Sequence, residues 1–99
     1  MEQLNALIAK YEENTRQGHE IVAETAEHLK TLKVGTIIEF DGSMFSLGWR
    51  IKLDEFENSR MWIYDGYSAV MCSESDESQM KMTATRLLLG TAKVVNNNG

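Results

Sequence analysis

Apolar side chains recur at helical spacing in the first third of the chain. Leu4, Leu7, Ile8 and Tyr11 follow the i, i+3, i+4, i+7 order that places side chains on one face of an α-helix. Residues 2–33 contain no proline, a single glycine and many strong helix formers. The pattern therefore predicts helix throughout this segment.

The single glycine of this segment leaves two arrangements open. Because glycine costs on the order of 1 kcal/mol inside a helix, either one long helix bends near Gly18 or two helices meet between Asn14 and Gly18. We favour the single helix. Its apolar positions form a heptad-like seam that would pair with a second copy. The residues expected in this self-association contact are Leu4, Ile8, Tyr11, Val22 and Leu29.

Downstream of Lys33 the apolar residues alternate with polar ones, as in a strand with one buried face. The longest alternation predicts a strand that ends near residue 53 and turns every second side chain toward the core. The residues on that core-facing side are Phe45, Leu47, Trp49, Ile51 and Leu53.

An Asp-Gly pair precedes this strand and predicts the corner of a hairpin. A type I′ turn requires positive φ at two successive positions, which aspartate tolerates and glycine prefers. With Asp41-Gly42 as the corner, Phe40 lies opposite Ser43, and Val34 lies opposite Trp49.

A second Asp-Gly pair, Asp65-Gly66, predicts another two-residue hairpin. This corner places Tyr64 opposite Tyr67 and puts Trp62 and Cys72 on opposite faces. Both faces of the hairpin then carry apolar side chains. We expect the N-terminal helix to cover one face, and the other to be covered as well or to form a contact surface.

Residues 77–89 fit a helix slightly better than a strand. Asp76 and Gln79 are spaced as in an N-terminal capping box, and Gly90 stands where a C-terminal cap belongs. An alternation of apolar and polar residues that begins at Met80 also suits a strand, so both readings stay open.

The length of 99 residues allows one hydrophobic core, so we expect a single domain over residues 1–99. Its parts are a helical segment at 1–33, a sheet segment at 34–95 with a helix at 77–89, and a frayed tail at 96–99. The predicted fold class is α+β: a long N-terminal helix packed on a small twisted antiparallel sheet of four to six strands. Closure of the sheet into a partial barrel is left open.

Charge and composition restrict the partners. Fifteen acidic against ten basic residues give a net charge of −5, which repels a phosphate backbone and favours a basic protein partner. We expect no direct binding to nucleic acid and no membrane insertion, because no apolar run exceeds four residues. Residues 1–5 do not resemble a secretory signal and Cys72 is the only cysteine, so we expect a cytoplasmic protein.

Candidate catalytic and metal-binding groups are sparse. Glu20, Glu24 and His28 lie at successive i+4 steps, but a fourth ligand and the HExxH spacing are missing. Cys72 has no histidine nearby in the sequence, which is typical of an inert thiol. We therefore assign no catalytic, cofactor-binding or metal-binding residue and expect no enzymatic activity.

These observations favour a protein-interaction module, in a concrete form a small acidic inhibitor or adaptor of the phage-accessory type that docks on a basic, nucleic-acid-binding protein. The residues expected at the partner contact are Arg60, Trp62, Tyr64, Tyr67, Glu74, Asp76 and Glu77. One alternative is a structural protein that self-associates through the N-terminal seam, for example as a homodimer. The other is a β-barrel that binds a small ligand or an oligonucleotide through the same arginine and aromatic residues.

Overall fold

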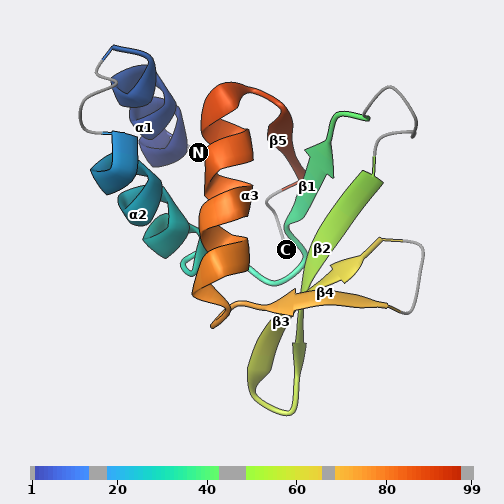
Figure 1. Ribbon diagram of the computed structural model, residues 1–99. Helices are drawn as coiled ribbons and strands as arrows, with labels where there is room; N and C mark the ends of the chain where they lie inside the picture. Colours follow the sequence, from blue (N-terminus) through green and yellow to red (C-terminus); the bar gives the residue numbers. More distant parts are fainter. Residues whose placement is uncertain (1, 14–17, 43–48, 66–68, 97–99) are drawn as a thin grey trace.

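The structure of the protein, a computed structural model, describes residues 2–13, 18–42, 49–65 and 69–96 and has an α+β fold (Figure 1). Three helices lie together on one side of an antiparallel sheet. In none of these helices do length and apolarity reach what a membrane crossing demands. The elements in chain order are α1 (Glu2–Glu13), α2 (Gly18–Leu29), β1 (Ile37–Phe40), β2 (Trp49–Phe56), β3 (Ser59–Tyr64), β4 (Val70–Ser73), α3 (Glu77–Leu89) and β5 (Ala92–Asn96).

The N-terminal segment folds into two helices of 12 residues each, so the expectation of one long helix is wrong. Folding back lets both helices bury their apolar faces: Leu7 of α1 packs with Ile21 of α2 and Leu88 of α3 in one cluster. Gly18 begins α2 beside α1, where a Cβ atom at this position would be in van der Waals contact with Cε1 of Tyr11, at 3.4 Å. The apolar side chains of both helices are thus buried within one chain and do not form an extended heptad seam.

The five strands form an open sheet in the order β4-β3-β2-β1-β5, with every neighbouring pair antiparallel. In the described part of the chain β4 and β5 are the two edges and do not pair, so the partial-barrel alternative is wrong. Helix α3 carries the chain from one edge to the other. It therefore crosses the face of the sheet on which α2 also packs (Figure 1).

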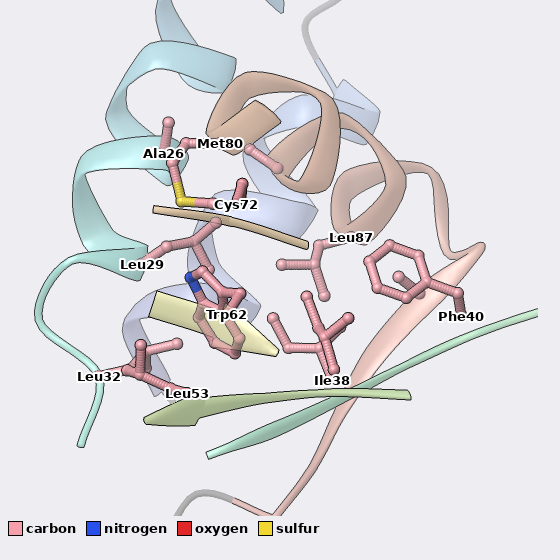
Figure 2. Close-up of a cluster of buried hydrophobic side chains, with 13 residues drawn as sticks. Ala26, Leu29, Leu32, Ile38, Phe40, Leu53, Trp62, Cys72, Met80 and Leu87 are labelled. Atoms are coloured by element: carbon pink, nitrogen blue, oxygen red, sulfur yellow. The ribbon is translucent and has the colours of Figure 1, made fainter. Parts of the chain in front are cut away.

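The core lies between this face of the sheet and the helices α2 and α3. Figure 2 shows the indole of Trp62 at its centre, next to Leu29 of α2 and Cys72 of β4. The alternation predicted for β2 is confirmed where the strand is described, because Ile51 and Leu53 are both fully buried. Trp49 is half-buried, and Phe45 and Leu47 lie outside the described residues.

The first hairpin differs from its prediction. Phe40 pairs with Trp49, so Asp41-Gly42 is not a two-residue corner. The two aromatic rings stack with centroids 5.0 Å apart, and the guanidinium of Arg86 lies 5.3 Å from each centroid. The backbone N–H of Asp41 donates to the carbonyl of Thr91, which ties this residue to the chain leading into β5. Pairing with β5 therefore outweighs the local turn preference.

The second hairpin also has a different register. Trp62 pairs with Cys72, and both are buried on the same face, so the predicted separation of these two residues is wrong. The register shifts between Trp62 and Ile63, and the N–H of Tyr64 donates to the carbonyl of Ala69. A bulge therefore adjusts the strand, and Asp65-Gly66 is not a two-residue corner; Gly66 and Tyr67 lie outside the described residues.

Residues 77–89 adopt the helical alternative. Asp76 caps the N-terminus of α3 by accepting a hydrogen bond of 3.1 Å from the N–H of Gln79. Gly90 ends the helix with a φ of 82°, a left-handed conformation that glycine adopts without steric cost. Both caps are local, and the sequence spacing identifies them correctly.

Candidate protein-interaction surface

The hairpin of β2 and β3 projects beyond the rest of the sheet (Figure 1). Its strands pair over six residue pairs, from Ile51 with Tyr64 to Phe56 with Ser59. The turn consists of two residues with positive φ, Glu57 at 51° and Asn58 at 67°, as a type I′ corner requires. The long ladder and the short turn make this a well-ordered projection.

The end of this hairpin, residues 54–58, is called the hairpin tip. Phe56 is 64% exposed, a large apolar side chain left in water. Asp54, Glu55 and Glu57 are its neighbours along the chain and are exposed as well; Asp54 shares the strand face of Phe56, and Glu55 lies on the opposite face. None of these three carboxylates forms an ion pair with another described residue. The tip therefore combines an aromatic ring with uncompensated negative charge.

The basic residue nearest to the tip in the ladder is engaged elsewhere. Arg60 is the cross-strand partner of Glu55, yet its Nε donates to Oε2 of Glu74 at 2.9 Å. Its terminal nitrogen also donates to the backbone carbonyl of Leu32, in the segment between α2 and β1. The guanidinium joins β3, the residue that follows β4 and this segment, so it does not neutralise the carboxylates of the tip.

The aromatic residues predicted to contact a partner lie mainly in the core. Trp62 is 0% exposed and presents no surface, because bulge and alternation turn it toward the helices. Tyr64 is partly buried and packs against the same cluster. Tyr67 lies outside the described residues.

The charged residues predicted for the partner contact stabilise connections within the molecule. Glu74 pairs with Arg60 as described, and Asp76 caps α3. Glu77 accepts a hydrogen bond of 2.8 Å from Nζ of Lys30, which links α3 to α2, and this bond lowers the pKa of the Glu77 carboxyl. The structure does not gather the predicted partner-binding residues into one surface.

The predicted self-association seam is also used internally. Leu4 and Leu29 are buried, whereas Ile8, Tyr11 and Val22 are half-buried against the apolar clusters between the helices and the core. No continuous seam is left for a second copy in this part of the chain.

The face of the sheet opposite the helices is a second exposed surface, called the open face. Among the described elements, none lies over it (Figure 1). Two cross-strand rows of side chains run across its centre. The first row contains Ile37, Lys52, Ile63 and Val70, and the second contains Asp54, Met61 and Ser73.

The open face is partly apolar and unevenly paired in charge. Val70 is 52% exposed on it, and Ile63 is half-buried. Glu39 accepts contacts from two cations, Arg50 at 2.7 Å and Lys93 at 3.8 Å. Lys52 stands between apolar neighbours and forms no ion pair with the residues described. Asp54, in the second row, likewise forms no ion pair with a described residue.

The candidate reactive groups are not activated by their surroundings. Burial raises the pKa of the Cys72 thiol to about 11, which leaves very little thiolate at neutral pH. Burial also lowers the pKa of His28. Glu24 of the same helix face lies 3.9 Å from Nζ of Lys10. Within the described ranges no three metal-binding side chains converge, including the set of Glu20, Glu24 and His28.

The alternation in the sequence predicts a strand that ends near residue 53, so it does not predict Phe56 and the tip. Asn58 was the available signal, since asparagine tolerates positive φ better than most residues. Comparison of the chain with protein families, curated proteins and solved structures finds no match.

Proposed function

We propose that this protein is a non-enzymatic protein-binding module that docks its hairpin tip on a basic, nucleic-acid-binding protein, as a small inhibitor or adaptor of the phage-accessory type. Phe56 carries this proposal: it is 64% exposed at the end of an ordered hairpin, and three carboxylates without described ion-pair partners lie next to it along the chain.

Each part of the tip contributes a different term to binding. Full burial of a phenylalanine side chain in a partner's pocket is worth about 1.5–3 kcal/mol. The carboxylates of Asp54, Glu55 and Glu57 steer the tip toward a basic surface and occupy positions that phosphates otherwise take. Because the type I′ turn holds the tip in place, little conformational entropy is lost on docking.

The proposed compartment is the cytoplasm, where thiols stay reduced. Cys72 is the only cysteine of the chain and is buried, so it needs no oxidising environment and forms no internal disulfide. The same buried thiol, with its raised pKa, supports a binding function rather than nucleophilic catalysis.

A photo-crosslinking side chain at position 56 identifies the partner. The matched control carries the same group at Met82, which is 46% exposed on α3, away from the tip. We expect the position-56 variant, and not the control, to capture a basic protein from cells of the source organism. Capture through both positions alike, or of an acidic protein, would count against docking through the tip.

Affinity for the captured protein then tests the chemistry. Phe56→Ala and Glu57→Lys should each weaken binding at least about tenfold, a loss of roughly 1.4 kcal/mol. Glu20→Lys changes the net charge equally on exposed α2 and should have little effect. Binding to the intact protein should fall steeply as salt rises, since exposed charges are screened within about 10 Å at 0.1 M salt. Equal losses for both charge reversals would contradict a local role of the tip.

A further inference from the structure

We propose that the open face of the sheet is the contact surface of a two-fold symmetric homodimer, in which two sheets pack face to face. The observation behind it is the order of side chains along β2 on this face: Arg50, Lys52, Asp54 and Phe56. The strand is basic toward one end and acidic and aromatic toward the other. Such an order is complementary to itself when reversed.

A two-fold axis produces this reversal. The axis lies in the plane of the interface and runs perpendicular to β2 at the level of Leu53. It places Lys52 against Asp54 of the second copy and Asp54 against Lys52 of the second copy. The ammonium that has no described partner in one chain thereby gains a carboxylate. Arg50 faces Phe56 of the second copy, a cation–π arrangement.

The neighbouring strand fits the same operation. Met61 lies in register with Asp54, and Ile63 lies in register with Lys52. The axis therefore sets Ile63 against Met61 of the second copy, and the reverse contact follows by symmetry. Apolar contacts and ion pairs alternate across the interface, and each contact occurs twice.

Charge selects the second copy over the basic partner of the hairpin tip as the occupant of this face. The open face carries the cations Arg50, Lys52 and Lys93 and the carboxylates of Glu39, Asp54 and Asp65, so its charges balance, although the whole chain has a net charge of −5. A basic protein would find no net negative charge there, whereas a reversed copy meets its complement.

The area of the open face limits the dimer to low affinity. The five strands contain 27 residues, which at about 3.3 Å per residue and about 4.8 Å between strands give a face of roughly 430 Å² in plan, before the relief of side chains is counted. A stable interface removes about 800 Å² from each partner. Two copies must therefore use the whole open face, and the expected dimer is a weak one.

Charge-swap variants test this arrangement by sedimentation velocity from about 1 to 200 µM. The wild-type protein should dimerise in this range. K52D and D54K should each be monomeric, because each brings like charges together twice. The double variant K52D/D54K, which keeps the net charge of the wild type, should dimerise again. An equimolar mixture of the two single variants should form a heterodimer, since every contact is then attractive.

A wild-type protein that stays monomeric up to about 200 µM would overturn the dimer. Single variants that dimerise as the wild type does, or a mixture that stays monomeric, would overturn this geometry. Circular dichroism checks that the variants are folded. As an independent pair, Ile63→Asp should abolish the dimer, whereas Leu89→Asp, at a position that is 59% exposed on α3, should not. None of these measurements requires the partner of the hairpin tip, so the two proposals fail separately.

Discussion

Replacement of Glu57 by asparagine should stabilise the protein. Glu57 is held at a φ of 51° in the type I′ turn, a left-handed conformation in which Cβ crowds the following carbonyl. For an ordinary L-residue this costs roughly 1–2 kcal/mol, and asparagine tolerates the conformation better. Because Asn58 already supplies the second turn position, we expect Glu57→Asn to raise the free energy of unfolding by about 1 kcal/mol.

Urea unfolding followed by tryptophan fluorescence measures this gain, since Trp62 is buried and Trp49 is half-buried in the folded protein. With a urea slope of about 1–3 kcal/mol per M, a gain of 1 kcal/mol moves the midpoint up by about 0.3–1 M. The slope itself should not change, because the variant buries the same surface.

The control for this prediction is Glu55→Asn. This variant also removes a carboxylate from the tip, but at a strand position with ordinary φ. It therefore measures the relief of repulsion among the acidic residues, with no relief of backbone strain. We expect its midpoint to stay close to that of the wild type. If both variants gain equally, or if Glu57→Asn gains nothing, strain at position 57 is not the cause.

Two further predictions concern buried titratable groups. Cys72, with a pKa of about 11, should react with a disulfide reagent at pH 8 about 100-fold more slowly in the folded than in the unfolded protein, and a comparable rate would contradict its burial. Burial lowers the pKa of His28, so the unfolded chain binds a proton at this histidine more readily than the folded protein does. The stability that the neutral histidine contributes is complete above the unfolded pKa of 6.5. It is lost as the pH falls below that value. Denaturation between about pH 7 and 5 should therefore show a decline in stability that His28→Gln reduces.

Local signals in the sequence predicted the elements whose structure is local. The caps of α3 depend on Asp76, Gln79 and Gly90, which interact within their own helix ends, and the helix has the expected bounds. The alternation of Ile51 and Leu53 with charged neighbours likewise gives the buried face of β2. In both cases one face of one element decides the outcome.

Distant contacts decided the rest. Asp41 is drawn to Thr91, about fifty residues away, so the Asp-Gly preference for a tight corner is overruled. The N-terminal helices separate because Leu7 and Ile21 can reach Leu88 only when the segment folds back. The two-residue turn lies instead at Glu57 and Asn58, where the sequence has no glycine. The pattern of the sequence therefore does not predict the hairpin tip.

The two proposed contacts cannot form at the same time on one chain. Asp54 and Phe56 belong to the hairpin tip, and both also lie on the open face opposite Lys52 and Arg50 of a second copy. A dimer therefore buries the ring and one carboxylate that the basic partner would bind. Under both proposals the partner must displace the second copy, so dimerisation lowers the apparent affinity by the fraction of chains held as dimer. A basic partner that competes for Asp54 binds the monomer. Dilution of this protein at a fixed concentration of the partner therefore raises the fraction of chains in the complex.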